Sequence, residues 1–269
     1  MDPSPDNRHA RHLTLPQVGA AGQRAIETSR VLIVGLGGLG SPAALYLAGA
    51  GVGRREPGRL VLADFDVVEL SNLQRQIAHT TGRAGQLKTH SAREACLAID
   101  PDLAIDTVDH GLDEEDLAER VPDMDLVLDC SDNFATRFAI NAACVRAGVP
   151  LVIGAAIRFD GQIMTVDPRC ADTPCYRCLY EDAEGSTGQD DTCAQAGILG
   201  PVVGLVGCLQ ALEALKLLCG AGTSLAGRLM LIDGLSTSVN EIVVAPRPGC
   251  RVCATRPALY RAPERPDGA

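Results

Sequence analysis

Short apolar runs alternate with amphipathic stretches along most of this 269-residue chain. Residues 31–34 are four consecutive apolar β-formers, which predicts a strand buried on both faces. Further strands are predicted over 60–63, 104–108, 126–130, 151–153 and 163–166, and helices over 42–50, 88–99, 114–120 and 135–147. Because strands alternate with helices, we expect an α/β, Rossmann-like fold whose mostly parallel sheet is covered by helices on both faces.

The pattern changes after residue 180. Residues 181–193 are mostly Glu, Asp, Gly, Ser and Thr, with almost nothing to bury, which predicts a mobile loop. A long helix is predicted over 202–219, and two more strands over 228–233 and 242–245. We therefore expect an N-terminal arm and helix over 1–29, one folded domain over 30–260 and a frayed tail over 261–269.

Composition narrows the classes of function. The formal net charge is −10, and aromatic residues make up 3% without any tryptophan, which argues against nucleic-acid binding. The least charged run, 194–212, contains Pro201 and precedes Glu213, so we interpret it as a loop entering a buried helix rather than a membrane span. The first residues are polar, so a cytoplasmic location is expected. In that compartment, eleven cysteines indicate metal binding or thiol chemistry rather than disulfides.

The glycine-rich stretch after the first strand predicts a nucleotide site. Gly35, Gly37 and Gly40 form a Gly-x-Gly-x-x-Gly run, with Gly38 inside it, and a helix is predicted to follow. A helix N-terminus offers free N–H groups to a phosphate, and glycines let the backbone approach it closely. Asp64, after the second strand, stands where dinucleotide-type folds hold a ribose hydroxyl. The pattern fits NAD, FAD and ATP equally.

Charged residues farther along the chain favour a triphosphate. Arg75 and Lys88 could stabilise the charge that develops when the bond between the α- and β-phosphates breaks, although each is alternatively an ordinary surface residue. Asp132 and Asn133 follow the strand over 126–130, at the edge where parallel sheets bind ligands. A carboxylate there suits Mg²⁺. The alternative is that Asp132 only caps the next helix.

Two Cys-x-x-Cys pairs are the strongest single signal in the sequence. Cys175, Cys178, Cys250 and Cys253 suit a closed, tetrahedral site for structural Zn²⁺, which would attach the C-terminal part to the rest of the domain. The alternative is a set of unrelated buried cysteines. Cys193 stands apart at the end of the acidic loop, where a thiol is accessible and can also be incidental.

Several motifs together resemble those of the ThiF/MoeB/HesA family, bacterial relatives of the ubiquitin-activating enzymes. They are the glycine run, Asp64-Phe65-Asp66, Ser71-Asn72-Leu73-Gln74-Arg75-Gln76, Asp129-Cys130-Ser131-Asp132-Asn133, Pro174-Cys175-Tyr176-Arg177-Cys178 and Leu209-Gln210-Ala211-Leu212-Glu213. The resemblance spans Arg11 to Cys253 and implies a homodimeric, ATP-dependent adenylyltransferase. Its substrate would be the C-terminal glycine carboxylate of a ubiquitin-like sulfur-carrier protein, which becomes an acyl-adenylate as pyrophosphate leaves.

The resemblance also implies roles for individual residues. The nucleotide site would use Asp64 at the ribose, Asn72, Arg75 and Lys88 at the phosphates, Asp132 at Mg²⁺, and Gln76 and Asn133 beside them. The arm over 8–12, which polarity alone predicts to be solvated, resembles a segment from which Arg11 reaches the ATP of the partner subunit. Cys193 stands where the family has a loop cysteine, which in some members is linked to the carrier or to sulfur.

Two departures from the family pattern affect the N-terminal region. Residues 54–59 form an insert in a connection that is usually tighter, and His9 replaces a common Tyr. The sequence shows no rhodanese domain, so we expect a separate sulfur donor, such as a cysteine desulfurase or a rhodanese.

The resemblance leaves two branches open. Residues 155–162 resemble the molybdopterin-synthase branch, which we favour, whereas residues 41–47 and 200–204 resemble the thiamine branch. Outside the family, an NAD-dependent oxidoreductase would use the same glycine turn but would leave the two cations and Asp132 without a role. A non-catalytic scaffold that binds a carrier or tRNA would leave the same set unexplained.

Overall fold

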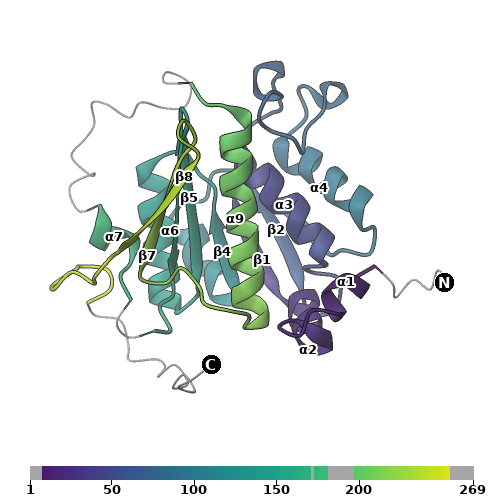
Figure 1. Cartoon of the computed structure of the whole chain (residues 1–269). Coiled ribbons are helices and arrows are strands. Elements are labelled where there is room, and N and C mark those ends of the chain that lie inside the picture. Colours follow the sequence, from purple (N-terminus) through teal and green to yellow (C-terminus); the bar gives the residue numbers. More distant parts are fainter. Residues whose placement is uncertain (1–7, 171–172, 181–196, 255–269) are drawn as a thin grey trace.

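One mixed β-sheet organises the chain. The computed structural model describes residues 8–170, 173–180 and 197–254, and within these ranges eight strands join one sheet (Figure 1). Their order across the sheet is β3-β2-β1-β4-β5-β6-β7-β8. The strands are β1 (Arg30–Val34), β2 (Arg59–Ala63), β3 (Ile105–Val108), β4 (Leu126–Asp129), β5 (Leu151–Ile157), β6 (Asp160–Val166), β7 (Arg228–Asp233) and β8 (Ser238–Val243).

The helices connect the strands and cover the sheet. They are α1 (Ala10–Leu13), α2 (Gly19–Thr28), α3 (Gly40–Ala50), α4 (Lys88–Ile99), α5 (Glu114–Arg120), α6 (Phe134–Ala147), α7 (Tyr176–Leu179) and α9 (Gly200–Cys219), with short 3-10 turns η2 (Leu70–Asn72), η3 (Thr81–Arg83) and η4 (Val121–Asp123). The predicted helices over 88–99 and 114–120 match α4 and α5 residue for residue. The loop predicted over 181–193 and the tail over 261–269 lie outside the described residues.

The sheet is parallel in its first part and antiparallel in its last. The five strands from β3 to β5 pair in parallel, as the alternation of strands and helices predicts. The pairs from β5 to β8 are antiparallel. Only residues 158 and 159 separate β5 from β6, and so short a connection can join only antiparallel neighbours. The expectation of a mostly parallel sheet therefore describes the part of the fold from β3 to β5.

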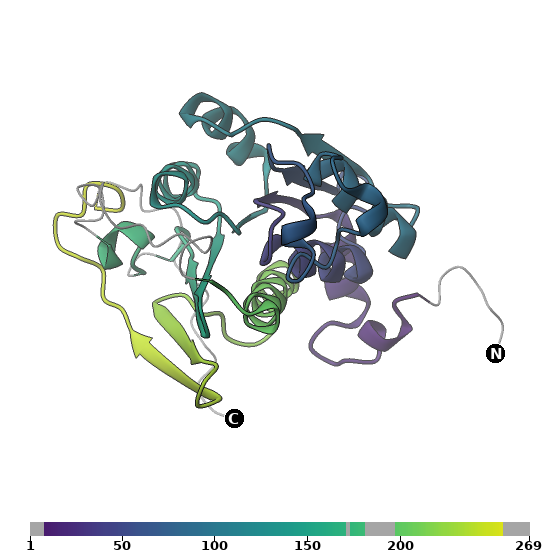
Figure 2. The same cartoon turned by 90° about the horizontal axis from the view of Figure 1, so that it is seen from above.

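Alternate residues of β1 show how the sheet divides the core. Val31 and Ile33 pack in a cluster with α3, α4 and α9, whereas Leu32 and Val34 pack with α5 and α6 on the other face. All four side chains are buried. Figure 2, seen from above, shows the helices on both sides of the strands. Because both faces are covered, β1 is a continuous apolar run rather than an alternating one.

Helix α9 is a core helix. Its length and composition would allow it to cross a membrane, but it packs against β4, β5 and β6 on one side and α2 and α3 on the other. Two buried polar side chains on it find partners in the fold: Gln210 Nε2 donates to Asp129 O at 2.8 Å, and Glu213 accepts a hydrogen bond from Leu225 N at 2.7 Å. These contacts agree with the prediction of a buried helix.

Two glycines on α9 give a matched test of this packing. A Cβ on Gly207 would lie 2.3 Å from Leu39 O, so Gly207→Ala forces α9 away from α3 and is predicted to lower the free energy of unfolding by about 1–3 kcal/mol. A Cβ on Gly204 meets nothing within 4 Å, so Gly204→Ala should gain up to about 1 kcal/mol from helix propensity. Urea unfolding measures both. Equal effects of the two substitutions would contradict the close approach.

Candidate active site

The glycine run forms a tight turn between β1 and α3, as predicted. Gly35 has φ +91°, and a Cβ there would lie 2.7 Å from Cys130 O, after β4. A Cβ on Gly40 would lie 1.9 Å from Gly35 O, and one on Gly38 would lie 2.7 Å from Val203 Cγ2. Three of the glycines are therefore required by close packing. At Gly37 the nearest atom to a Cβ is Gln76 Nε2, at 3.5 Å, so the turn is less crowded there.

Asp64 and His79 hold the glycine turn in place. Asp64 Oδ2 accepts a hydrogen bond from Leu36 N at 2.7 Å, and Oδ1 accepts one from Asp66 N at 2.8 Å. His79 is buried, with Nε2 3.0 Å from Leu36 O and Nδ1 2.9 Å from Ser91 Oγ. Because a carbonyl can only accept, Nε2 carries the proton and donates to Leu36 O. Sequence reasoning missed His79, which no motif marks.

The two predicted cations lie on the β2 side of the turn. Lys88 is buried at the start of α4, with Nζ 2.7 Å from Asp66 Oδ2. Arg75 is half-buried and bonds within its own motif: Nη2 donates to Asn72 Oδ1 at 3.1 Å, and Nη1 donates to Ser71 O at 3.2 Å. Lys88 is thus not the ordinary surface residue of the alternative interpretation, because it is buried beside a carboxylate.

Asp132 and Asn133 lie in the turn between β4 and α6. Asn133 is the cap of α6, since its Oδ1 accepts a hydrogen bond from Thr136 N at 2.9 Å. The suggestion that Asp132 caps this helix is therefore wrong: the cap is one residue later, and the Asp132 side chain is exposed. Among the described residues, no hydrogen bond or ion pair engages the Asp132 carboxylate, which leaves its oxygens available to a ligand.

Buried polar groups fix the turn that carries Asp132. Asp129 is fully buried, and its Oδ1 accepts hydrogen bonds from Ser131 N at 3.0 Å and from Ser131 Oγ at 2.6 Å. Arg137 Nη2 donates to Ser131 O at 2.8 Å from the first turns of α6. Burial raises the pKa of the Asp129 carboxyl, while the nearby Arg137 guanidinium acts to lower it.

The predicted nucleotide residues therefore meet at one edge of the sheet. The glycine turn follows β1, Asp64 follows β2, and Asp132 follows β4 on the other side of β1. The chain leaves β1 toward β2 and β3 and then returns to β4, so the strand order reverses beside β1. Open α/β sheets bind ligands at the carboxyl ends of the strands at such a reversal.

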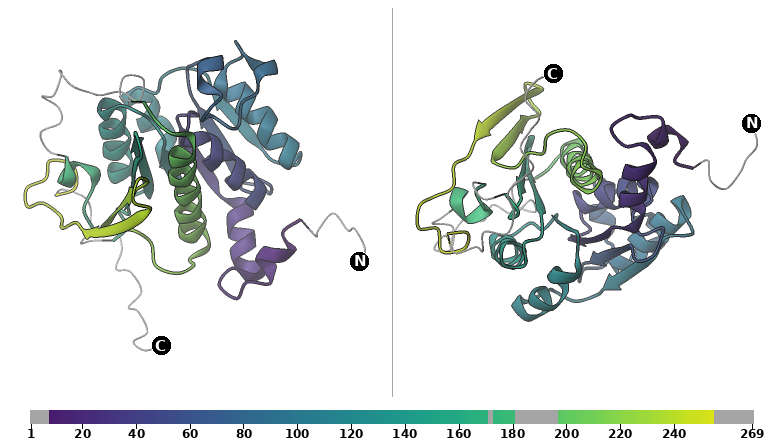
Figure 3. Two further views of the ribbon diagram at one scale, coloured as in Figure 1. Left: turned by 45° about the horizontal axis from the view of Figure 1, so that its top comes forward. Right: turned by 90° about the horizontal axis from the view of Figure 1, so that it is seen from below.

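Arg11 lies at the other end of the sheet. A Cβ on Gly22, in α2, would lie 3.1 Å from Cys219 Cβ at the last residue of α9, whereas Gly38 meets Val203 near the first. About 24 Å of α9 separates these two contacts, from the rise of a helix. Figure 3 shows the purple N-terminal helices beside the lower end of the green α9. Arg11, on α1 beside α2, is therefore far from the nucleotide residues of its own chain.

The four predicted metal ligands converge. Their sulfur atoms all lie within 4.8 Å of one another, with Cys175 Sγ 3.7 Å from Cys250 Sγ and Cys178 Sγ 3.4 Å from Cys253 Sγ. A tetrahedral ion with metal–sulfur bonds of about 2.3 Å needs sulfur atoms about 3.8 Å apart, so the cluster fits a metal. Burial would raise the pKa of Cys250, but hydrogen bonds from the backbone N–H groups of Cys253 and Val252 lower it to about 7.

The cysteine cluster is attached to α6 through α7. Tyr176 N, next to Cys175, donates to Asn141 Oδ1 at 2.9 Å, and the Tyr176 ring lies 5.5 Å from that of Phe138. The Arg177 guanidinium lies 4.1 Å from the centroid of the Phe138 ring. A metal here would join the C-terminal segment to the helix that begins beside Asp132. Cys193 lies outside the described residues.

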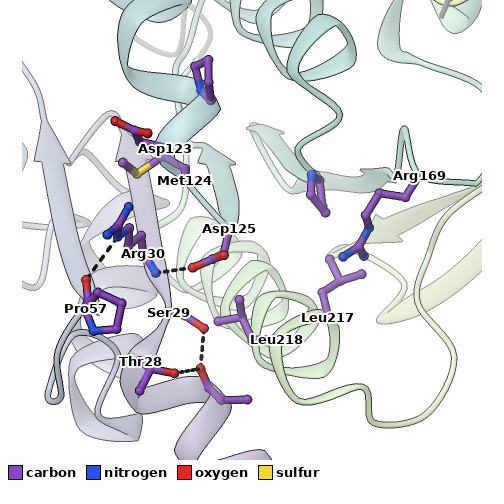
Figure 4. Close-up of a pocket in the computed structure, with 13 residues that line it drawn as sticks. Thr28, Ser29, Arg30, Pro57, Asp123, Met124, Asp125, Arg169, Leu217 and Leu218 are labelled. Carbon is purple, nitrogen blue, oxygen red and sulfur yellow. Dashed lines mark hydrogen bonds between the residues drawn. The ribbon is translucent and has the colours of Figure 1, made fainter. Parts of the chain in front are cut away.

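A cavity of about 660 Å³ lies away from these residues. Arg30, Asp125, Arg169 and Leu217 are among the residues that line it, at the amino ends of β1 and β4 (Figure 4). Arg30 N donates to Asp125 Oδ2 at 2.8 Å inside it. None of the nucleotide or metal residues predicted from sequence lines this cavity.

The burial of His79 predicts a pH dependence. Burial lowers the pKa of His79, so between that lowered pKa and the unfolded value of about 6.5 the unfolded chain binds more protons. The contribution of neutral, buried His79 to the free energy of unfolding is complete above about pH 6.5. It is lost as the pH falls toward the lowered pKa. His79→Gln keeps an N–H donor but cannot titrate, so urea unfolding should show a smaller loss of stability between about pH 6.5 and 5. An unchanged slope would contradict this assignment.

Comparison with known proteins shows which sequences this chain is similar to. The sequence profile of the ThiF family matches residues 9–252. The molybdopterin-synthase adenylyltransferase of Escherichia coli is 47% identical over 247 residues, which are 91% of this chain and 95% of that protein. The sulfur carrier protein ThiS adenylyltransferase of the same organism is 46% identical over 246 residues, 91% of this chain and 94% of that protein. The SAMP-activating enzyme E1 of Haloferax volcanii is 42% identical over 253 residues, which are 94% of this chain and 90% of that protein.

Solved structures agree on the fold. The crystal structure of Escherichia coli MccB superposes with a TM-score of 0.79 at 23% identity and covers 95% of this chain and 74% of that one. At this identity the likeness concerns the fold alone. The profile match and the identities over nearly the whole length go further, and on them the chain belongs to the ThiF family.

Proposed function

We propose that this protein is an ATP-dependent adenylyltransferase that activates the C-terminal carboxylate of a ubiquitin-like sulfur-carrier protein. The observation that carries the proposal is the meeting of the glycine turn, a buried lysine and an exposed aspartate at one edge of the sheet. The names of the relatives support it, since they are adenylyltransferases of sulfur-carrier systems or a SAMP-activating enzyme. An NAD-dependent oxidoreductase is the alternative, but hydride transfer would leave Lys88 and Asp132 without a function in the site.

The chain's own residues supply binding and charge stabilisation. The N–H groups of the glycine turn and the N-terminus of α3 face the phosphates, and Asp64 keeps free lone pairs for the ribose hydroxyls. A carboxylate oxygen of the carrier attacks the α-phosphorus, the bond from that phosphorus to the bridging oxygen breaks, and pyrophosphate leaves. Arg75 and Lys88 stabilise the charge that develops on the leaving oxygens.

The resting contacts of the two cations are compatible with this role. An ammonium has three donors, so Lys88 can keep Asp66 and still donate to a phosphate oxygen. Arg75 is held through Asn72 and Ser71, which leaves part of its five-donor fork for phosphate. Gln76 lies beside the glycine turn, where it is buried and faces Gly37. Its Oε1 has no hydrogen-bond partner within the described ranges. Asn133 lies beside the site as the cap of α6, next to Asp132.

Asp132 would hold Mg²⁺. Its exposed carboxylate projects from the turn after β4, and Mg²⁺ binds through one or two carboxylates together with substrate phosphates. Bound there, the ion would neutralise charge on the pyrophosphate. The residues that fix this turn, Asp129 and Arg137, do not compete for the ion, because they are turned inward and paired with Ser131.

We further propose a homodimer in which Arg11 acts on the partner's ATP. Arg11 is exposed, and its side chain has no hydrogen bond or ion pair to any residue that the structure describes. About 24 Å of helix lies between its end of α9 and the glycine turn, which is farther than an arginine side chain reaches. Exposed apolar residues on α3 and α9, Tyr46 (60%), Leu205 (46%) and Leu212 (52%), offer a face for the second copy.

For the carrier, we favour the molybdopterin-synthase branch. The two Escherichia coli relatives of known branch differ by one percentage point of identity, so overall identity does not separate them. Residues 155–162, at the end of β5 and the start of β6, favour the molybdopterin branch. Residues 41–47 and 200–204 favour the thiamine branch, which is the second candidate. A separate sulfur donor and a cytoplasmic location belong to the same proposal.

ATP–pyrophosphate exchange tests the function. The purified protein should catalyse exchange only with a sulfur carrier present, and the faster of the two carrier classes identifies the branch. Asp132→Ala or Arg75→Ala should lower the exchange rate by about 10²–10³-fold, because each removes charge stabilisation of the leaving group. Asp123→Ala, an exposed aspartate at the other edge of the sheet, is the control and should keep the wild-type rate. Absence of exchange with either carrier would overturn the proposal.

The cysteine cluster should bind zinc and stabilise the fold. Metal analysis should give about one zinc per chain, as expected for a closed four-thiolate site. Cys250→Ser with Cys253→Ser should lose the metal and lower the midpoint of thermal unfolding, whereas Cys219→Ser, a half-buried cysteine of α9, should keep the metal. Full stability of a metal-free double variant would show that the cluster is not a structural zinc site.

A further inference from the structure

The insert between α3 and β2 folds back against α2. Arg55 N donates to Glu27 O at 3.0 Å, and Arg59 N donates to Ser29 O at 3.0 Å. A Cβ on Gly58 would lie 2.5 Å from Glu27 O, so the two backbones pass very close to each other. The insert is therefore part of the packed structure at the end of the sheet where α1 lies.

One ionic contact of the insert reaches the arm through Glu27. This carboxylate is buried, and it accepts hydrogen bonds from Arg55 Nε, from His9 Nδ1 at 3.1 Å and from Gln23 Nε2 at 3.2 Å. A buried carboxylate is stable only with such partners, and the Arg55 guanidinium supplies the positive charge. The His9 ring is buried and packs closely against Gly51, since a Cβ added to that glycine would lie 2.7 Å from the ring.

A second ionic contact reaches the arm through Asp100. This side chain is completely buried at the end of α4. Its Oδ2 lies 3.1 Å from Arg54 Nε and 3.3 Å from Arg8 Nε, and Arg54 Nη2 also lies 3.0 Å from Asp102 Oδ2. Arg8 Nη1 donates to Ile99 O at 2.6 Å. Two arginines, one from the insert and one from the arm, thus share one buried negative charge.

These contacts determine where α1 lies. The helix has four residues and buries none of them, so it has no hydrophobic anchor of its own and is too short to be stable alone. Arg8 and His9 fix its beginning, and His12 Nδ1, 2.8 Å from Gln23 Oε1, fixes its end. Arg11 stands between these fixed points.

We propose that Arg54 and Arg55 are positioning residues for Arg11: by neutralising Asp100 and Glu27 they hold the arm in the orientation that presents Arg11 to the second subunit. The inference rests on the proposed function of Arg11 across the dimer. Loss of the two insert charges leaves two buried carboxylates with less compensation, which loosens Arg8 and His9 and misplaces Arg11.

Mixed dimers test this proposal. When one subunit carries Arg11→Ala and the other Asp132→Ala, one complete site remains, built from Asp132 of the first subunit and Arg11 of the second. The double substitution Arg54→Ala and Arg55→Ala is then added to either subunit. Exchange should fall about tenfold or more when it is on the Asp132→Ala subunit, which supplies Arg11, and stay within about twofold of the parent when it is on the other.

Two controls separate positioning from stability. Arg54→Lys with Arg55→Lys should restore most of the rate on the Arg11-supplying subunit, because the charges return. Arg59→Ala, which removes only an exposed ion pair of the same insert, should have no effect on either subunit. Equal losses in both placements, or no loss in either, would overturn the proposal. An inactive parent mixed dimer beside an active wild type would refute action across the dimer itself, and the positioning role with it.

Discussion

The structure depends on how closely two backbone segments, the glycine turn and the turn after β4, approach each other at the end of β1. A Cβ at Gly40 would lie 1.9 Å from Gly35 O, and one at Gly35 would lie 2.7 Å from Cys130 O, so the glycine turn and the turn after β4 are in direct backbone contact. Asp64 and His79 fix the same turn from the β2 side through Leu36. This contact brings the glycine turn next to the segment that carries Asp132. The proposed chemistry follows from that arrangement.

The two ends of the sheet have different tasks in this account. The carboxyl end holds the nucleotide residues on connections that buried polar groups keep rigid, Asp129 and Arg137 among them. The amino end holds α1 with ionic contacts to buried carboxylates, and its exposed Arg11 lies far from the predicted nucleotide residues of its own chain. The cysteine cluster is joined to the carboxyl end, because α7 packs on α6 and α6 begins beside Asp132. In the homodimer that we propose, opposite ends of two sheets would come together, and Arg11 of one subunit would complete the site of the other.

Much of the fold and site follows from local patterns in the sequence. The apolar runs predict the strands, the 88–99 pattern predicts α4, and the Cys-x-x-Cys pairs predict a cluster that converges in the structure. The features that local sequence patterns do not predict are those that depend on contacts between residues far apart in the chain. His79 has no motif, because its partners are a backbone carbonyl and Ser91. The burial of His9 and the pairing of Arg54 with Asp100 require the packed arm, and Asn133 rather than Asp132 caps α6 because backbone geometry selects the residue just before the first turn.

In the proposed reaction, the carrier's carboxylate attacks the α-phosphorus of ATP and the bond between the α- and β-phosphates breaks. The most direct measurement follows ATP carrying radioactive phosphorus in either the α- or the γ-position in a single turnover with the sulfur carrier. The α-label should move to the carrier as an acyl-adenylate, and the γ-label should leave in pyrophosphate. Release of the γ-label as orthophosphate, with the α-label in ADP, would contradict it.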